Sequence, residues 1–524
     1  MGVCYAREWL PRVAHGKMPA KASAAQYRRR FGAIRFECRA GNTGMESETT
    51  HDRVRKLSII IPVYNEIRTL ESLLRRVMNA PLPCDREIIV VDDGSTDGSR
   101  EFLQSFAREH EGEGVRLVLH ERNAGKGQAI RSALPHVTGD WVIVQDADLE
   151  YDPADYAVLL APAMEGFADA VFGSRFIMGR YRRALYFWHT VLNKVLSLFC
   201  NMLSGLNLTD IETCYKLVRA DILKNTNLRG NRFDIEPELT MKLAQWGARI
   251  YEVPISYRGR TYAEGKKIGA WDGLIALWTA VKYGVWRADY STHRGFVVLQ
   301  AMGKARRFNR WLLSQFASWL GDNVLEAGCG IGNLTTHLLD RKRLVCIDVE
   351  PFYVDRLQDA YGHLANVTFK RADLTRAEDM EAVAALGPFD TVLTINVLEH
   401  IEDDQGVLER FFRLLSPGGA AIVLVPNAPE LYTPLDRALG HLRRYTADEL
   451  TEKMTQAGFH VVACWGFNRV GALGWRLSGH VLGRETVSTG QIRLFEWGMP
   501  LIRFAERFPF HIHNSLIAIG RKPN

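Results

Sequence analysis

The chain has 524 residues, of which 47% are hydrophobic and 24% charged, so a soluble protein of two or three globular domains is expected. Its formal net charge of +6 lies entirely in residues 1–55, because the rest of the sequence contains as many Lys and Arg as Asp and Glu residues. A charge confined to one tail excludes a nucleic-acid footprint over the whole protein, and no nucleic-acid partner is predicted.

The eight cysteines are scattered without a CxxC pair, so they indicate neither a zinc site nor a disulfide framework, and a reducing cytoplasm is expected. The sequence has no run of about 18 uninterrupted apolar residues and no apolar core near its start. Neither a transmembrane helix nor a secretory signal is therefore predicted. Residues 1–55 are predicted to be a basic, disordered arm, although a translation start at Met45 would explain them equally well.

From residue 57, short apolar strands alternate with helical stretches, which is typical of a mainly parallel sheet. The stretch LSIIIPVYNE (57–66) predicts a buried strand ending at Pro62, followed by Tyr64 and Glu66. The stretch REIIVVDDGSTDGS (86–99) repeats the pattern, with a strand over 87–91 and Asp93 in the loop. Ligands of open α/β sheets bind beyond the carboxyl ends of the strands, so these loops are expected to border a site.

Four carboxylates follow the next predicted strand at every second position. In VIVQDADLEYDP (142–153) they are Asp146, Asp148, Glu150 and Asp152. A solvated loop would hardly need this spacing, whereas oxygen ligands at the end of a strand suit Mg²⁺ or Mn²⁺ together with substrate phosphates. Upstream, NAGKGQAIRSAL (123–134) offers glycines for close approach of a ligand and Lys126 for positive charge, although such loops are common.

These motifs, in this order, resemble the family 2 glycosyltransferases with the GT-A fold, particularly the dolichyl- or polyprenyl-phosphate sugar transferases, over residues 57–285. The resemblance implies inverting sugar transfer from a nucleotide-sugar. The donor pocket would comprise Pro62, Tyr64, Glu66, Asp93, Lys126 and Asp146. Asp146 and Asp148 would be the DxD pair that holds Mg²⁺ or Mn²⁺ on the donor diphosphate, with Glu150 as a further ligand. The ion would act as a Lewis acid for the departing nucleoside diphosphate.

The acceptor side is expected in residues 172–176, 208–219 and 233–269. Candidate phosphate or acceptor partners are Arg175, Lys216, Arg258, Arg260, Lys266 and Lys267, of which about half are expected to be solvated surface. Candidate general bases are Asp210, Glu236 and Glu238. If the acceptor is a lipid phosphate, its oxygen is already ionised, and a strong base would hardly be required.

The segment 182–208 predicts an apolar helix with few charges, preceded by Arg180, Arg182 and Arg183, and residues 271–286 predict a second one. A buried core helix is one interpretation. A helix that dips into the bilayer interface, with arginines at anionic head groups, is the other. With a polyprenyl-phosphate acceptor, the second interpretation places the protein on the cytoplasmic face of a membrane as a peripheral protein.

A second strand, loop and helix unit begins at NVLEAGCGIGNLTTHLL (323–339), where Glu326, Gly328, Gly330 and Gly332 form a glycine-rich loop. A dinucleotide-binding loop would want glycine or alanine at the sixth position, which is Asn333 here. Three further predicted strands end at Asp348, Asp373 and Asn396. An acidic residue at the end of the second strand can accept hydrogen bonds from both hydroxyls of a ribose.

With VLEHI (397–401) and LSPGG (415–419), this succession resembles the class I S-adenosylmethionine-dependent methyltransferases over residues 305–522. The resemblance implies a Rossmann-like fold and S-adenosylmethionine as cofactor. Its contacts would be Glu326, Gly328, Gly330, Asp348, Asp373 and Asn396, with Leu374 near the adenine. In-line methyl transfer demands mainly the alignment of acceptor and sulfonium, so no protein nucleophile is needed.

The segment 425–450 lies where this family places its acceptor-specific insertion. It contains Tyr432, Asp436, His441, Arg443, Arg444 and Tyr445. His441 could be the base for a sugar hydroxyl, with arginines gripping phosphate or carboxylate; a structural RRY that packs on the sheet is the alternative. The apolar and aromatic stretches 467–483 and 493–510 could form a lid, a lipid-facing surface or a domain interface.

The predicted organisation is an arm (1–55), a GT-A domain (56–290), a linker with a helix (291–320) and a methyltransferase domain (321–524). Three functions fit it. A bifunctional enzyme would glycosylate an acceptor, with polyprenyl phosphate favoured, and methylate a related glycan or lipid. A single-activity glycosyltransferase would use cofactor binding only for regulation or stability. A non-catalytic membrane scaffold would tolerate eroded motifs, but Asp146, Asp148 and Asp348 are intact.

Overall fold

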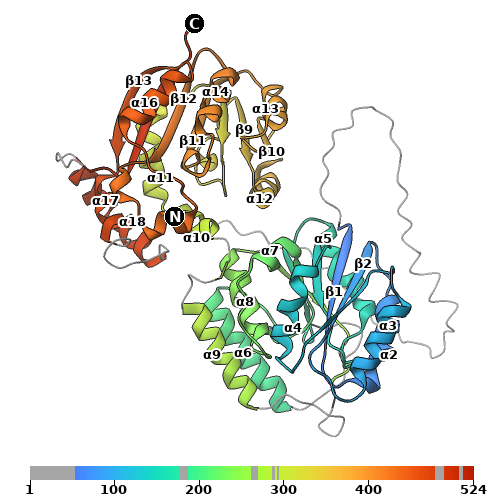
Figure 1. Ribbon diagram of the computed structural model, residues 1–524. Coiled ribbons are helices and arrows are strands. Elements are labelled where there is room, and N and C mark those ends of the chain that lie inside the picture. Colours follow the sequence, from blue (N-terminus) through green and yellow to red (C-terminus); the bar gives the residue numbers. More distant parts are fainter. Residues whose placement is uncertain are drawn as a thin grey trace, which may run out of the picture. The chain divides into compact units, whose positions relative to one another are not determined.

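The computed structural model describes residues 54–177, 187–260, 270–285, 290–291, 294–477, 489–506 and 512–524 (Figure 1). Most of the predicted arm lies outside these ranges. So do Arg180, Arg182, Arg183, Lys266 and Lys267.

The first domain is built on a seven-stranded sheet of order β3-β2-β1-β4-β6-β5-β7. Strands β1, β2, β3 and β4 are parallel, whereas β6 runs antiparallel to both β4 and β5. The predicted mainly parallel sheet is therefore a mixed one. The strands are β1 (Lys56–Val63), β2 (Asp85–Asp92), β3 (Val115–Leu119), β4 (Trp141–Val144), β5 (Ala170–Ser174), β6 (Lys216–Arg219) and β7 (Ile250–Pro254).

Helices follow most of these strands and bury one apolar face against the sheet. In α2, Leu70, Leu73, Leu74 and Val77 are buried, and their spacing is that of one helix face. The helices of this domain are α2 (Ile67–Met78), α3 (Ser99–Glu109), α4 (Lys126–Ala133), α5 (Tyr156–Met164), α6 (Phe187–Ser204), α7 (Ala220–Asn225), α8 (Ile235–Trp246) and α9 (Ala270–Val285).

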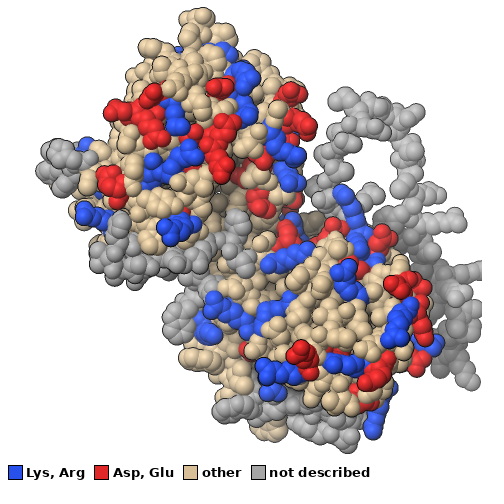
Figure 2. Space-filling model, in the orientation of Figure 1, with Lys and Arg blue, Asp and Glu red and all other residues tan. Residues whose placement is uncertain are grey.

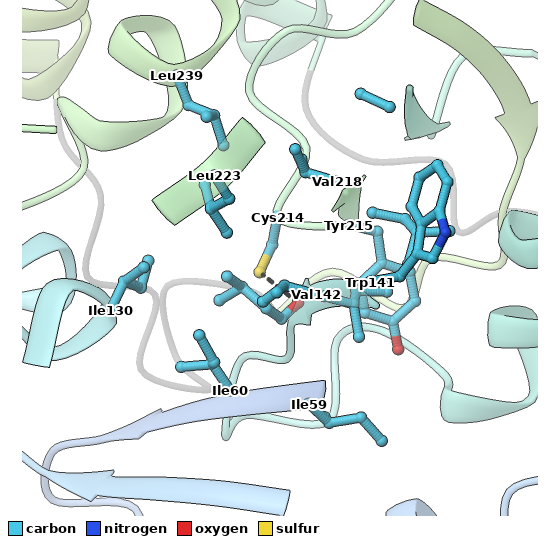
Figure 3. Close-up of a cluster of buried hydrophobic side chains, with 14 of the residues drawn as sticks. Ile59, Ile60, Ile130, Trp141, Val142, Cys214, Tyr215, Val218, Leu223 and Leu239 are labelled. Carbon is cyan, nitrogen blue, oxygen red and sulfur yellow. Dashed lines mark hydrogen bonds between the residues drawn. The ribbon is translucent and has the colours of Figure 1, made fainter. Parts of the chain in front are cut away.

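The core of this domain reaches up to the carboxyl ends of the strands. Figure 3 shows a cluster of buried side chains that includes Ile59 and Ile60 of β1, Val142 of β4, Val218 of β6 and Cys214. The Cys214 Sγ atom lies 3.4 Å from the carbonyl oxygen of Val144 and 3.4 Å from the Lys126 Nζ atom. The apolar core therefore ends at Cys214, which contacts Lys126, a charged residue at the carboxyl edge of the sheet.

The second domain has its own seven-stranded sheet, of order β10-β9-β8-β11-β12-β14-β13. It is parallel from β10 to β12, and β14 is antiparallel to both of its neighbours. Its strands are β8 (Asn323–Ala327), β9 (Arg343–Asp348), β10 (Val367–Arg371), β11 (Phe389–Ile395), β12 (Leu415–Pro426), β13 (His460–Phe467) and β14 (Ser515–Arg521). The prediction of two α/β domains is confirmed.

The helices of this half are α10 (Arg294–Gly303), α11 (Arg306–Phe316), α12 (Pro351–Tyr361), α13 (Ala377–Ala384), α14 (Asp404–Leu414), α15 (Pro434–Leu439), α16 (Ala447–Gln456), α17 (Arg469–Arg476) and α18 (Thr489–Ala505). A short 3-10 turn, η7 (Leu398–His400), follows β11. It leads the chain from the carboxyl end of that strand towards α14.

The surface of the described chain carries charges of both signs. On the face shown in Figure 2, Lys and Arg side chains are interspersed with Asp and Glu side chains. Among the helices within the described ranges, none is both long enough and apolar enough to cross a bilayer. The predicted apolar helix over 182–208 is α6, and Figure 1 shows it side by side with α9.

Candidate active sites

In the first domain, the loops after β1 and β2 are tied to each other at the carboxyl edge of the sheet. Asn65 adopts a left-handed conformation with φ 54°, and its Oδ1 atom accepts the Thr96 N–H at 2.8 Å. Its own N–H donates to the Ser95 Oγ atom at 3.1 Å. Tyr64 and Glu66, which are predicted to bind the nucleotide-sugar, therefore lie on a loop that is hydrogen-bonded to the loop after β2.

Asp93 organises the glycine loop that precedes α4. Its buried carboxylate accepts the N–H groups of Ala124 at 2.9 Å and Gly125 at 2.8 Å, and the Nδ1–H of His120 at 2.7 Å. Gly125 has φ 97°, and a Cβ atom there would lie 2.3 Å from the carbonyl oxygen of Asn231. Only glycine fits this approach, so the loop fixes Lys126 at the first position of α4.

Lys126 joins the acidic stretch after β4 to α8. Its Nζ atom lies 2.8 Å from the Asp146 Oδ1 atom and 3.0 Å from the Glu236 Oε1 atom. Burial opposes its charge, but the neighbouring groups, Asp146 first and Glu236 among them, together outweigh burial and hold the pKa of Lys126 well above its ordinary value. The ammonium group is therefore a permanent cation next to the carboxylate of Asp146.

Asp148 lies among like charges. Burial and the neighbouring carboxylates of Asp146 and Glu150 raise the pKa of Asp148 to about 7, although the Arg260 guanidinium opposes this shift. The Arg260 Nη2 atom lies 2.5 Å from the Asp148 Oδ2 atom. Glu150 accepts the Tyr257 hydroxyl and the Arg260 N–H, both at 2.8 Å.

This donor set fits a divalent cation. Mg²⁺ is usually held by one or two carboxylates together with phosphate oxygens, and Mn²⁺ has the same preference for oxygen ligands. Repulsion from Asp146 and Glu150 adds to burial in raising the pKa of Asp148, and a bound cation would relieve that repulsion. Asp146 and Asp148 would hold the ion. Glu150 would keep Tyr257 and Arg260 in place beside it.

The candidate bases on the acceptor side are all ion-paired. Asp210 receives two N–H groups of the Arg175 guanidinium at 2.7 and 2.8 Å. Lys216 is fully buried, and its Nζ atom lies 2.6 Å from the Glu236 Oε2 atom. Glu238 is paired in the same way with Lys242 at 2.6 Å. Each candidate base is therefore already engaged by a cation of the protein itself.

The remaining predicted residues of this domain are placed differently. Arg258 is half-exposed, with its Nη2 atom 3.6 Å from the Asp152 carboxylate. Pro62 is half-buried at the end of β1, and Tyr64 is exposed. Lys267 lies outside the described residues. Arg175 stacks on Tyr257, with the guanidinium carbon 5.1 Å from the ring centroid, so it reaches the same side as Glu150.

In the second domain, the glycine loop after β8 is closed onto β9. The N–H groups of Gly328 and Cys329 donate to the carbonyl oxygen of Ile347, and the Gly330 N–H donates to the Asp348 Oδ2 atom at 2.8 Å. Gly328 has φ 81°, and a Cβ atom there would lie 2.3 Å from the Val397 side chain. Burial raises the pKa of Asp348 above its ordinary value.

Glu326 is buried beneath this loop. Its Oε2 atom accepts the Thr335 hydroxyl at 2.7 Å, and burial raises the pKa of Glu326 to about 7. Asp373 is half-buried and accepts from the N–H and hydroxyl groups of Thr375. Asn396 is exposed at the end of β11, with φ 53°. The predicted cofactor residues thus occupy the ends of four adjacent strands.

In the predicted acceptor segment, two residues of the RRY motif pack as the structural interpretation expects, and the role of His441 as a base stays a prediction. Arg444 and Tyr445 are buried; Arg444 donates to the Asp436 Oδ1 atom at 2.8 Å, and Tyr445 donates to the Asp404 carboxylate at 2.8 Å. His441 donates from Nδ1 to the same Asp436 oxygen at 2.9 Å. Although burial opposes it, these hydrogen bonds hold the pKa of Asp436 well below its ordinary value.

Two residues that the sequence did not single out join this segment. VLEHI served only as a family marker, but Glu399 and His400 lie beside His441, with ligand atoms of all three within 4.8 Å of one another. Burial raises the pKa of Glu399 to about 8 and lowers that of His400 to about 4. The adjacent Glu399-His400 pair could have indicated a cluster of ligand-type side chains from the sequence. Its partner His441, however, lies 41 positions beyond His400.

Two family models match the chain. Residues 58–226 match the model described as glycosyl transferase family 2, and residues 302–463 match the model described as a methyltransferase domain. The chain therefore joins these two domains.

The curated relatives match the first domain. An undecaprenyl-phosphate 4-deoxy-4-formamido-L-arabinose transferase of Klebsiella pneumoniae subsp. pneumoniae is 33% identical over 219 residues, which are 41% of this chain and 64% of that protein. The Proteus mirabilis protein of the same name is 30% identical over 220 residues, or 42% and 64% of the two chains. The chain thus spans 64% of the length of these relatives.

Solved structures match each half. Glucosyl-3-phosphoglycerate synthase from Mycobacterium tuberculosis is 20% identical with a TM-score of 0.35, covering 44% of this chain and 80% of that one. A putative sarcosine dimethylglycine methyltransferase from Galdieria sulphuraria is 16% identical with a TM-score of 0.29, covering 41% and 86%.

Proposed function

We propose that this chain, which combines a family 2 glycosyl transferase domain with a methyltransferase domain, is a bifunctional transferase. The first domain transfers a sugar, with inversion, from a nucleotide-sugar to polyprenyl phosphate in a reaction that depends on Mg²⁺ or Mn²⁺. The second domain uses S-adenosylmethionine to methylate a glycan or lipid. The named substrate of the 33% identical relative supports the lipid-phosphate acceptor.

The observation that carries the first activity is the acidic stretch after β4 with its two cations. Lys126 and Arg260 neutralise Asp146 and Asp148. A bound divalent cation supplies Lewis-acid stabilisation of the leaving nucleoside diphosphate. When Asp146 and Asp148 turn to the ion, Lys126 and Arg260 are released from them and can reach the donor phosphates.

A phosphate acceptor suits this arrangement better than a hydroxyl. Phosphate oxygens are already ionised near neutral pH, so the acceptor needs orientation rather than deprotonation. Asp210 and Glu236, the candidate bases, are each held by a cation. Arg175 and Arg258 are the described arginines that we assign to the acceptor phosphate. A hydroxyl acceptor with Asp210 or Glu236 as base is the second candidate.

An exposed apolar face on α6 and α9 supports a lipid acceptor. Trp188, Leu192 and Leu198 of α6 are 71%, 60% and 62% exposed, and Trp278 of α9 is 61% exposed. Soluble monomers rarely expose so many large apolar side chains together. We propose that this face enters the bilayer interface, so that the protein is peripheral on the cytoplasmic side.

In the second domain, the proposal rests on the residues at the strand ends. S-adenosylmethionine supplies the electrophilic methyl group. Asp348 would accept from the ribose hydroxyls, Glu326 and the Gly328–Gly330 loop would hold the methionine part, and Asp373 and Asn396 would border the adenine and the methyl group. His441, oriented by Asp436, is the candidate that takes part in deprotonating an acceptor hydroxyl.

The deciding experiment offers labelled nucleotide-sugars to the full-length protein with polyprenyl phosphate and Mn²⁺ or Mg²⁺. Metal-dependent labelling of the lipid that is lost in Asp148→Asn would establish the first activity and name the donor. No labelling with any donor would overturn the lipid-phosphate acceptor and direct the search to glycan hydroxyls. The labelled lipid is then offered to the same protein with S-adenosylmethionine; binding of the cofactor without turnover would favour a regulatory second domain.

A further inference from the structure

Glu399, His400 and His441 form a cluster of ligand-type side chains in the second domain. Glu399 and His400 belong to η7, and His441 follows α15. Ligand atoms of the three residues lie within 4.8 Å of one another, and the His441 Nε2 atom is 3.8 Å from the Glu399 Oε1 atom. Two ligands of one tetrahedral ion, with bonds of about 2.1 Å, are about 3.4 Å apart. Small side-chain rotations would therefore bring these atoms to the spacing of two ligands on one ion.

The hydrogen bonds around the two imidazoles orient them as metal ligands. The Nδ1 atom of His441 faces a carboxylate oxygen of Asp436 at 2.9 Å, and that of His400 faces the carbonyl oxygen of Gly440 at 3.2 Å. Both partners can only accept, so each Nδ1 carries the proton and each neutral ring keeps a lone pair on Nε2. Metal-binding histidines typically donate their other ring N–H to such a carboxylate or carbonyl.

Glu399 supplies an independent observation. Its side chain is fully buried, and within the described chain neither carboxylate oxygen has a hydrogen-bond partner. A buried polar group without a partner is costly and calls for an explanation such as an absent ion. The backbone holds the residue in place, because the Leu442 N–H donates to the Glu399 carbonyl oxygen at 2.8 Å.

We propose that Glu399, His400 and His441 bind a divalent first-row transition ion such as Zn²⁺. Two imidazoles and one carboxylate suit Zn²⁺, Fe²⁺ or Co²⁺, whereas the all-carboxylate set at Asp146 and Asp148 suits Mg²⁺ or Mn²⁺. The two domains would then use ions of different chemistry.

The position of the cluster indicates what the ion would do. Turn η7 follows β11, which pairs with β8, the strand before the glycine loop. Val397, two residues before Glu399, is the side chain that a Cβ atom at Gly328 would strike. On the basis of the proposed methyltransferase activity, an acceptor hydroxyl bound to this ion would have a lowered pKa. The proton would pass to solvent water, and His441 would serve as a ligand of the ion rather than as the base.

The test measures Zn²⁺ binding to the full-length protein, stripped with a chelator, by competition with a chromogenic chelator. Asp148→Asn serves as the background, so that the first domain does not contribute. We expect one Zn²⁺ per chain and at least a 100-fold loss of affinity in His400→Ala and in His441→Ala. The matched control is His460→Ala, an exposed histidine on β13 of the same domain, which should bind as the parent does.

Co²⁺ absorption gives a second readout that needs no activity. A visible d–d band should appear with one equivalent of Co²⁺ and disappear in Glu399→Gln. Circular dichroism and thermal unfolding of the stripped variants separate lost ligands from lost fold, and His400→Gln is a milder variant because glutamine keeps a polar side chain that can still bond to the Gly440 carbonyl oxygen. Failure of the parent to bind Zn²⁺ at micromolar concentration, or equal binding by the His400 and His441 variants, would overturn the site. S-adenosylmethionine binding, measured on the stripped protein, would show separately whether the methyltransferase proposal survives.

Discussion

The two carboxyl edges of the molecule handle buried acids in opposite ways. In the first domain, Asp146 is paired with Lys126 and Asp148 with Arg260, so each acid has a cation within 2.8 Å. In the second domain, Glu326 and Asp348 receive hydrogen bonds from neutral groups instead. Burial raises the pKa of both acids there, as it does that of Asp148, so the difference lies in the partners and not in the direction of the pKa shift.

The difference follows from what each site is proposed to bind. A site for a metal ion and a diphosphate must hold both signs of charge, and its own cations keep the acids in place until they exchange partners. A site for S-adenosylmethionine, which carries a sulfonium and an ammonium group, can keep its acids without cations because the ligand brings the positive charge. Under this proposal, the first site would exchange ion pairs when its ligands bind, and the second site would form new ones.

The strongest test of this contrast is Asp148→Asn. We expect sugar transfer to fall about 1,000-fold, corresponding to about 4 kcal/mol, because the amide keeps the shape but loses a charged metal ligand. Cofactor binding by the second domain should be unchanged. The readout is the rate of lipid labelling at saturating Mn²⁺. Asp85→Asn, at the exposed opposite end of β2, is the matched control and should transfer sugar normally.

Lys216→Met separates a structural cation from a substrate-binding one. Lys216 is buried, pairs with Glu236 and donates to the carbonyl oxygens of Ile211 and Thr213. Breaking a buried pair costs about 3–5 kcal/mol, so we expect a large loss in thermal stability with an unchanged KM for polyprenyl phosphate. A raised KM in a protein of normal stability would instead assign Lys216 to the acceptor. Lys216→Met combined with Glu236→Gln should recover part of the stability.

The sequence was a good guide where one local pattern determines the site. Acids at every second position after an apolar strand predicted the place of Asp146, Asp148 and Glu150, and the glycine pattern predicted the loop before β9. Both signals arise from residues that are neighbours in the chain. The two α/β domains followed from the alternation of apolar strands and helices for the same reason.

What the sequence could not predict are partners brought together by the fold. Arg260 reaches Asp148 from 112 positions away, and no periodicity connects them. The burial of Lys216 could not be read from KLVR, and its assignment to phosphate stays a prediction. Glu399, His400 and His441 were missed as a group because their segments lie about 40 positions apart in the sequence, and contacts such as the hydrogen bond from the Leu442 N–H to the Glu399 carbonyl oxygen arise only from the fold.

Glu326→Gln tests the second half of the contrast. Because the pKa of Glu326 is raised from 4.5 to about 7 in the folded protein, its contribution to stability is fully present below pH 4.5 and is lost as the pH rises to about 7. Glutamine removes that loss, so the cofactor-free variant should be more stable than wild type at pH 8, by at most about 3 kcal/mol, and little changed at pH 4. Thermal unfolding at the two pH values is the measurement.

The same variant should bind S-adenosylmethionine about 10-fold more weakly, because a neutral amide cannot pair with the charge of the ligand. Isothermal titration at pH 8 measures this. Equal stability of the two proteins at both pH values would show that Glu326 is ionised at no cost. In that case the second site would not hold its acids at a cost that a cationic ligand relieves, and the contrast with the ion-paired acids of the first site would fail.

Arg260→Ala probes the exchange of ion pairs itself. In the folded protein the guanidinium occupies Asp148 and also reaches Glu66 and Glu150, so an arriving metal ion must displace it from a ligand. Without Arg260, the half-saturating Mn²⁺ concentration should fall, whereas the maximal rate should fall about 10-fold because a phosphate partner is lost. Both the half-saturating Mn²⁺ concentration and the maximal rate should therefore fall. Damage to the metal site would instead raise the half-saturating Mn²⁺ concentration. If the Mn²⁺ requirement rises instead, Arg260 supports the metal ligands, and the first site does not work by exchanging one cation for another.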